Sequence, residues 1–300
     1  MTPKSLNNPL AEVFGFPINN HSPDVRRKRE HRLCPFNNKI PKCTKVSKTD
    51  PLGVCSMYHK GQPVITCPAR FRQDWLMIAD AAEIFFGKGV LYTSLPEVRL
   101  VDKNGRKAGN IDYVLVRHDE RGRILDYASL EVQSVYISGT IKGAFDTYME
   151  DQNPDFEWVN VRNYPNPDYL SSSTKRLIPQ MLVKGGIFRH WGRRQAVAVQ
   201  ASFFNTLPKL AVAPVEEADL AWLLYDLILA PDGLRYNLTH IDTVYTRYDN
   251  ALKEFIEPQP DDEEKFLTGL QKAVHAKISG KSTTEVDILG EDNEAEDDQL

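Results

Sequence analysis

The chain has 300 residues and a formal net charge of −4, and 41% of its residues are hydrophobic. These values are typical of a globular protein that buries a sizeable core. No stretch approaches the ~18 consecutive apolar residues of a membrane span, and the N-terminus lacks the apolar core of a signal peptide. We therefore expect a cytoplasmic protein without a membrane segment and without structural disulfides.

The charge is unevenly distributed along the chain. Eight of the 41 acidic residues, and no Lys or Arg, lie between residues 285 and 300, which leaves 33 acidic against 37 basic residues elsewhere. Such a stretch repels itself, so we expect residues 281–300 to form an acidic disordered tail. A solvated terminus is one interpretation of this tail, and a mimic of DNA that competes weakly for the basic surface is the other.

The N-terminal part of the chain, residues 1–72, is polar and holds all four cysteines. A basic run at residues 26–29 suits either contacts with DNA phosphates or a solvated loop. Residues 34–67 are rich in Pro, Gly, Lys and Asn and nearly lack helical periodicity, so a bound metal ion would stabilise them. We expect residues 1–72 to form a small region with a four-cysteine metal site.

The rest of the chain alternates between helical and strand patterns. Residues 74–86 predict a helix with Asp74 as N-cap and Gly87 as C-terminal stop. Three strand-like runs separated by turn signals then predict an antiparallel meander over residues 90–101, 110–117 and 126–136. Later patterns predict helices over residues 140–151, 173–185, 215–230 and 261–278, and strands over residues 195–200 and 235–246. This order indicates an α/β fold, a mixed central β-sheet flanked by helices, with a small N-terminal four-cysteine metal-binding domain.

A pair of carboxylates marks the second and third expected strands. Asp112 interrupts an apolar run, where a charge is costly to bury without a partner. Glu131 and Gln133 are two residues apart on a strand and share one face, whereas Val132 points to the opposite face, into the core. If the two strands pair, Asp112 lies beside Glu131, and the two acids form a hard oxygen site for Mg²⁺. Two unrelated acids at strand edges are the alternative.

The four cysteines offer a second candidate site. Cys34, Cys43, Cys55 and Cys67 are separated by 9, 12 and 12 residues, without the Cys-x-x-Cys spacing of zinc ribbons. Four thiols nevertheless suit a tetrahedral site for Zn²⁺ or a single iron. His59 is a possible substitute ligand or a surface residue, and four unconnected buried thiols are the alternative interpretation.

Together these motifs resemble the NotI-type restriction endonucleases, a branch of the PD-(D/E)xK nucleases. Asp112 and Glu131 match the metal-binding acids of this family, and Gln133 matches its glutamine, which stands where most relatives carry lysine. Glu97 matches an additional active-site glutamate. The resemblance extends from about residue 11 to 184 and includes the segments Ala11-Glu12-Val13-Phe14-Gly15, Cys34-Pro35-Phe36, Gly53-Val54-Cys55 and Cys67-Pro68.

The resemblance implies a type II-like restriction endonuclease that uses Mg²⁺ to hydrolyse phosphodiester bonds at specific sites in double-stranded DNA. It implies a nuclease core with DNA-recognition elements over residues 73–280, and structural iron rather than zinc at the cysteines. Cleavage of a palindrome implies a homodimer, because protein symmetry mirrors site symmetry, and restriction implies a cognate DNA methyltransferase as functional partner. Candidate DNA contacts are Lys142, Lys175, Arg176, Gln180 and Lys184, with Arg189, Arg193 and Arg194 as further candidates.

Two other functions fit the same residues. The chain could be a modification-dependent or structure-selective nuclease, which would leave unmodified DNA uncut. It could also be a non-catalytic DNA-binding module with the cysteine region as its scaffold, in which case Asp112→Ala would change neither Mg²⁺ binding nor DNA cleavage.

Overall fold

The structure of the chain is a computed structural model that describes residues 8–37, 41–156, 164–257, 260 and 262–279. It divides into two compact units, Met1–Phe255 and Ile256–Leu300. In the second unit, helix α9 (Glu263–Ile278) begins after Asp262, whose side chain accepts a hydrogen bond from the backbone of Glu264. The helix expected over residues 261–278 is thereby confirmed. The tail predicted for residues 281–300 lies outside the described residues.

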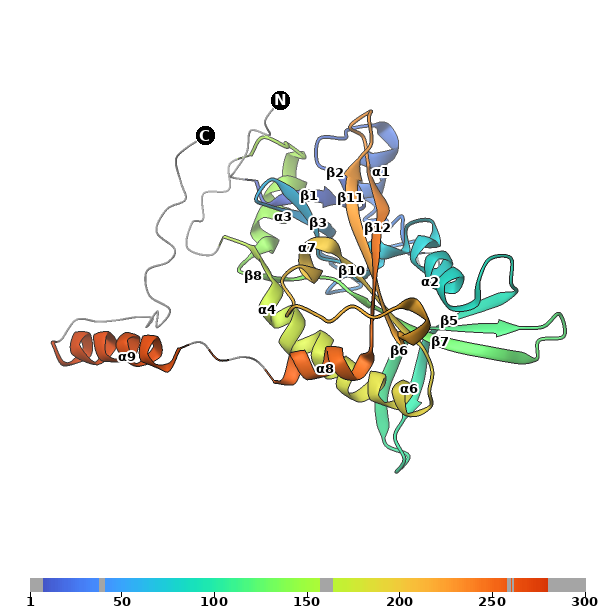
Figure 1. Cartoon of the computed structure of the whole chain (residues 1–300). Helices are drawn as coiled ribbons and strands as arrows, with labels where there is room; N and C mark the ends of the chain where they lie inside the picture. The colour runs from blue at the N-terminus through green and yellow to red at the C-terminus, as the bar shows by residue number, and fades with distance from the viewer. Residues whose placement is uncertain (1–7, 38–40, 157–163, 258–259, 261, 280–300) are drawn as a thin grey trace. The chain divides into compact units, whose positions relative to one another are not determined.

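A six-stranded mixed sheet forms the centre of the first unit (Figure 1), with the strand order β12-β11-β10-β7-β6-β5. Strand β10 runs parallel to both β7 and β11, and the other neighbours are antiparallel. The predicted meander is confirmed as β5, β6 and β7. The strands are β5 (Tyr92–Val101), β6 (Lys107–His118), β7 (Ile124–Gln133), β10 (Gln195–Gln200), β11 (Leu220–Leu229) and β12 (Tyr236–Thr246).

Helices cover both faces of this sheet, which confirms the α/β class. On one face, α2 (Leu76–Phe86) packs over Leu115 and Leu130 of the sheet. On the other face, α8 (Tyr248–Ile256), α7 (Ala201–Phe204) and a long helical stretch pack over Val197 and Trp222. That stretch extends the helix expected over residues 173–185 and consists of α4 (Tyr169–Ser172), the π-helical turn η3 (Ser173–Leu177), α5 (Ile178–Gln180), the π-helical turn η4 (Met181–Gly185) and α6 (Gly186–His190).

The N-terminal residues form a separate four-stranded antiparallel sheet, with the order β2-β1-β3-β4. Leu10, Val13 and Phe14 pack with Phe145 and Tyr148 of α3, which attaches this sheet to the rest of the unit. The remaining elements are β1 (Leu10–Val13), β2 (Phe16–Pro17), α1 (Pro23–Glu30), β3 (Val54–His59), β4 (Gln62–Ile65), η1 (Pro68–Trp75), β8 (Tyr136–Ser138), α3 (Ile141–Asp151), β9 (Asn166–Asp168) and η5 (Val215–Glu217). The helix expected over residues 140–151 is confirmed as α3. The domain boundary expected at residue 72 stays a prediction.

The helix expected over residues 215–230 is wrong, because most of this segment is strand β11. Nearly every position of the run is apolar, since the strand is covered on both faces: Leu223 and Tyr225 pack towards α2, whereas Trp222 and Leu224 pack towards α8. A continuous apolar run carries no periodicity that separates a buried strand from a buried helix.

The start of the helix expected at Asp74 is also wrong. Helix α2 begins at Leu76, and both Asp74 and Trp75 before it have positive φ angles, 52° and 55°. Trp75 occupies the N-cap position without a side-chain hydrogen bond, whereas Gly87 ends the helix with φ of 85°, as predicted. Among the described helices, none is both long and apolar enough to cross a membrane.

Candidate active site

Asp112 lies at the point where strands β6 and β7 separate. The last backbone pair between them is Tyr113 with Leu130. One residue further, the Asp112 Oδ2 accepts a hydrogen bond from the backbone N–H of Val132 at 2.9 Å. The carboxylate thus takes the place of a strand partner, and it lies next to Glu131 on the same face of the sheet. Val132 packs against the core cluster on the α2 face, as predicted.

Glu131 faces the long helical stretch and meets a lysine there. The Lys184 Nζ donates to the Glu131 Oε2 at 2.5 Å and to the backbone carbonyl of Asn110 at 2.9 Å. Lys184 is only 7% exposed. Its stem passes Gly109, where a Cβ atom would come within 3.3 Å of the lysine Cδ. This candidate DNA contact is therefore buried against strand β7.

The second carboxylate oxygen of Glu131 lies apart from the contact with Lys184. Glu131 Oε1 is buried and has no hydrogen-bond partner among the described residues. Burial raises the pKa of Glu131 to about 8, the neighbouring Asp112 carboxylate adds to this rise, and the Lys184 ammonium opposes it. An unpaired carboxylate oxygen beside a second carboxylate is an arrangement that a divalent cation relieves, so these residues fit Mg²⁺.

Glu97 lies across from Asp112 on strand β5. The neighbouring pairs are Pro96 with Tyr113 and Val98 with Ile111, which places Glu97 opposite Asp112 in the register. Its φ of 55° lies in the left-handed region, so the strand bends here. The Glu97 side chain is exposed and lines the same cleft as Asp112. The structure thus brings Glu97 close to Asp112, a pairing that the sequence predicted only through the family resemblance.

Gln133 follows Glu131 on the same face of β7. Its side chain is 5% exposed, and its Nε2 donates to the backbone carbonyl of Ser134 at 2.6 Å. This bond fixes the amide and leaves its Oε1 as an acceptor at the cleft. A neutral amide in this position can orient a water molecule but cannot act as a base.

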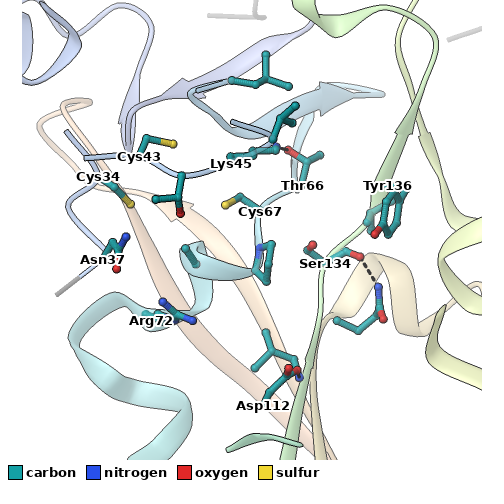
Figure 2. A pocket seen from close by; sticks show the side chains of 18 of the residues that line it. Cys34, Asn37, Cys43, Lys45, Thr66, Cys67, Arg72, Asp112, Ser134 and Tyr136 are labelled. Atoms are coloured by element: carbon teal, nitrogen blue, oxygen red, sulfur yellow. Dashed lines mark hydrogen bonds between the residues drawn. The ribbon is translucent and has the colours of Figure 1, made fainter. Parts of the chain in front are cut away.

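One cleft of about 640 Å³ extends from Asp112 and Glu97 to the cysteine segment, whereas Glu131 lines a separate small cavity with Lys184. Figure 2 shows Cys34, Cys43 and Cys67 at one end of this view, Asp112 at the other, and Arg72 between them. Sequence reasoning missed Arg72 and Lys45, since neither stands in a motif of charged residues. Residues that line the cleft include Cys34, Cys43, Lys45, Cys67, Arg72, Glu97, Asp112, Val132, Gln133, Tyr136, Arg176 and Gln180.

The cysteines approach one another without forming disulfides. All four are free; Cys43, Cys55 and Cys67 are buried and Cys34 is partly exposed. Burial raises the pKa of Cys34 to about 11 and also raises the pKa values of Cys43 and Cys55, with smaller contributions from the neighbouring cysteines. Within the described ranges, however, no group of three or more His, Cys, Asp or Glu side chains is placed to hold a metal ion. The predicted metal-binding domain is therefore not confirmed, and His59 contacts the ring of Tyr169 instead.

The candidate DNA contacts differ in their surroundings. The exposed Arg176 guanidinium lies 4.8 Å from the centre of the Tyr136 ring, and both residues line the cleft with Gln180. Lys175 is exposed on the same helical turn, and Lys142 is exposed on α3 and paired with Asp146 at 2.8 Å. These contacts remain predictions.

Most of the other basic candidates are engaged within the protein. Arg189 pairs with Asp249 at 2.7 Å, and both Arg193 and Arg194 pair with Asp126. In the basic run at residues 26–29, Arg29 is fully buried and donates to backbone carbonyls, so this part of the run has a structural role.

Comparison with known proteins gives one finding at the level of families. The family model described as restriction endonuclease NotI matches residues 12–238. The matched range contains the four cysteines, the three acids and Gln133. A search of curated proteins gave no match.

Proposed function

Since the chain belongs to the NotI restriction endonuclease family, we propose that it hydrolyses phosphodiester bonds at specific sites in double-stranded DNA, with Mg²⁺ held by Asp112 and Glu131. The observation that carries the proposal is the buried, unpartnered Glu131 Oε1 beside the Asp112 carboxylate. A divalent cation bound there would polarise the phosphate and lower the pKa of a bound water molecule.

The groups around Asp112 and Glu131 prepare the site for this chemistry. The Lys184 ammonium fixes Glu131 through its Oε2, which leaves Oε1 directed away from the lysine as a ligand. The Val132 N–H fixes Asp112 through its Oδ2 in the same way. We propose that Gln133 orients the attacking water with its amide oxygen and that Glu97 assists with the metal or the water from strand β5. Pre-set ligands of this kind need little rearrangement when DNA binds.

The cysteines have the donor chemistry of a structural metal site. We propose that Cys34, Cys43, Cys55 and Cys67 hold Zn²⁺ or iron, supported by four free thiols. Burial raises the pKa values of Cys34, Cys43 and Cys55, so metal binding must displace protons from these thiols and the affinity for metal should increase with pH. We further propose a homodimer that cuts a palindrome, and a cognate methyltransferase that protects the host DNA.

The test is cleavage of a large unmethylated phage DNA by the wild-type protein and by Glu131→Gln, which keeps the shape of the side chain and an acceptor for Lys184. Discrete Mg²⁺-dependent bands from the wild type and none from the variant would support the proposal. Glu120→Gln, at an exposed turn, is the matched control and should cut normally. A smear from the wild type would show that the protein cuts DNA without sequence specificity. Cleavage of methylated DNA alone would indicate a modification-dependent nuclease.

A further inference from the structure

Arg72 is a positively charged side chain in the cleft that the nuclease mechanism has not used. It belongs to η1, the short helix that starts directly after Cys67, and it is half-buried. It lines the cleft together with Glu97 and Asp112, and Figure 2 shows its guanidinium between the cysteines and Asp112. We propose that Arg72 binds the DNA phosphate that lies at the acid site, an inference that rests on the proposed nuclease function.

The electrostatic surroundings of Arg72 leave its charge available to a ligand. No acidic group among the described residues lies within ion-pair distance of Arg72, whereas Arg70, two residues earlier, is paired with Glu12 at 3.0 Å. Arg72 and Tyr113 line the same cleft. The five N–H donors of the guanidinium form a planar fork that matches two oxygens of a phosphate.

Tyr113 lines the same cleft as Arg72, Asp112 and Glu97. This tyrosine follows Asp112 on strand β6 and lies opposite Pro96, the neighbour of Glu97. The guanidinium and the two carboxylates therefore border one space. A phosphate bound between the metal-binding acids and the guanidinium would contact both. The cation therefore lies where a phosphate oxygen needs neutralisation.

The backbone that carries Arg72 is held firmly. Arg70 is fully buried, and besides Glu12 it donates to the backbone carbonyl of Tyr236 at 2.8 Å and to Gln73 Oε1 at 2.7 Å. Phe71 is fully buried in the core on the α2 face. Arg72 thus extends from a fixed point between the buried Phe71 and Gln73, whose Oε1 also accepts a hydrogen bond from the Leu238 N–H, as expected for a preorganised phosphate ligand and not for a solvated surface arginine.

Arg106 provides a matched control for the experiment. It is an exposed arginine in the turn between β5 and β6, and it does not line the cleft. Arg72→Met keeps the length and apolar stem of the side chain without its charge, and Arg72→Lys keeps the charge without the fork. Thermal unfolding of each variant shows whether it folds.

The first measurement is binding of a DNA duplex as a function of salt, with Ca²⁺ replacing Mg²⁺. Loss of one phosphate contact should reduce the slope of log K against log salt by about 0.9. Arg72→Met should show this reduction, and Arg106→Met should keep the slope of the wild type. An unchanged slope for Arg72→Met would overturn the proposal, whether or not the protein cuts DNA.

The second measurement is single-turnover cleavage with Mg²⁺. Arg72→Met should cut about 10²-fold or more slowly than the wild type, as found when one charge-stabilising donor is removed, and Arg72→Lys should recover part of the loss. A reduced slope together with normal cleavage would place the contact away from the acid site and contradict the inference while leaving the nuclease intact. A wild-type protein that cuts no DNA would instead refute the proposed function, and the assignment of Arg72 to the scissile phosphate would fall with it.

Discussion

The acid site and the cysteine cluster both contribute residues to one cleft, Asp112 and Glu97 on one side and Cys34, Cys43 and Cys67 on the other, but the two groups are assembled in different ways. Asp112 and Glu131 stand on neighbouring strands of the central sheet, and strand register alone brings them together. The cysteines come from three segments: Cys34 and Cys43 from the chain after α1, Cys55 from β3, and Cys67 from the residue before η1. The acid site is thus formed by the register of two strands, whereas the cysteine cluster depends on how separate segments of the chain pack together, and we propose that a metal ion completes it.

This difference predicts that one group of residues matters mainly for cleavage and the other mainly for the stability of the fold. The acid site places two carboxylates where the inner strands β6 and β7 separate, outside the hydrophobic core clusters, so its residues should matter for cleavage and little for folding. The cysteine cluster and the contacts around it hold the small N-terminal sheet in place, so they should matter for folding first. Each of the following predictions tests one side of this contrast, and together they can refute it.

The largest effect is expected from Glu131→Gln. Removal of a metal-binding carboxylate should lower the cleavage rate on the order of 10⁴-fold or more, as for other residues that act in the reaction itself. The melting temperature at neutral pH should change little, because the pKa of Glu131 is raised to about 8, so the amide replaces a mostly protonated carboxyl and still accepts a hydrogen bond from Lys184. The measurement is single-turnover cleavage beside thermal unfolding. A large drop in melting temperature would show that the acid site also holds the fold together.

Arg70→Met should have the largest effect on stability. Arg70 and Glu12 form an ion pair in which both side chains are fully buried, and Ser56 donates a further hydrogen bond to Glu12. Removal of one partner leaves a buried uncompensated charge, so the free energy of unfolding should fall by about 3–5 kcal/mol. Chemical denaturation measures this value. The double variant Glu12→Gln, Arg70→Met should recover part of the loss, and additive losses would show that the pair is not coupled.

Cys67→Ser should destabilise the protein if the cysteines hold a metal. We expect a loss of bound Zn²⁺ or iron and a fall in melting temperature on the order of 10 °C, since metal binding contributes directly to the folding free energy. Elemental analysis and thermal unfolding measure the two effects. A strong chelator should reproduce the fall in the wild type and add nothing in the variant. A wild type without metal and indifferent to chelator would remove the metal site.

The smallest effect is a pH dependence of Mg²⁺ binding. The pKa of Glu131 is raised to about 8, so the metal-free carboxyl is largely protonated below that pH and Mg²⁺ must displace the proton. The apparent Mg²⁺ affinity should therefore rise by up to about tenfold per pH unit between ~6 and ~8 and then level off.

The raised pKa of Glu131 also makes the stability of the folded protein depend on pH. Because the folded pKa lies above the unfolded value, this group's stabilising contribution is present below the unfolded pKa and is lost as the pH rises through about 8. Added Mg²⁺ should therefore raise the melting temperature more at pH 8.5 than at pH 6.5, and Glu131→Gln should abolish that difference. An equal Mg²⁺ effect at both pH values in the wild type would contradict the raised pKa.

Local sequence patterns predicted the elements that carry the acid site. Alternation along a strand placed Glu131 and Gln133 on one face and Val132 on the other, because the side-chain period of a strand is fixed at two. Turn signals gave the meander of β5, β6 and β7, and with it the neighbourhood of Asp112 and Glu131. Strand β11 was misread as a helix, because a segment that is buried on both faces shows no period at all.

The sequence by itself determined the α/β class, the pair of strands with the two acids, and the four cysteines as a group. Only the tertiary structure decided that Lys184 reaches Glu131 from 53 residues away and that Arg72 enters the cleft beside Asp112. The physical reason is distance along the chain: period and turn chemistry act over a few residues, whereas a contact between a helix and a strand depends on how whole elements pack. A lysine on a helix and an arginine in a short turn look like solvated charges until the sheet beneath them is in place.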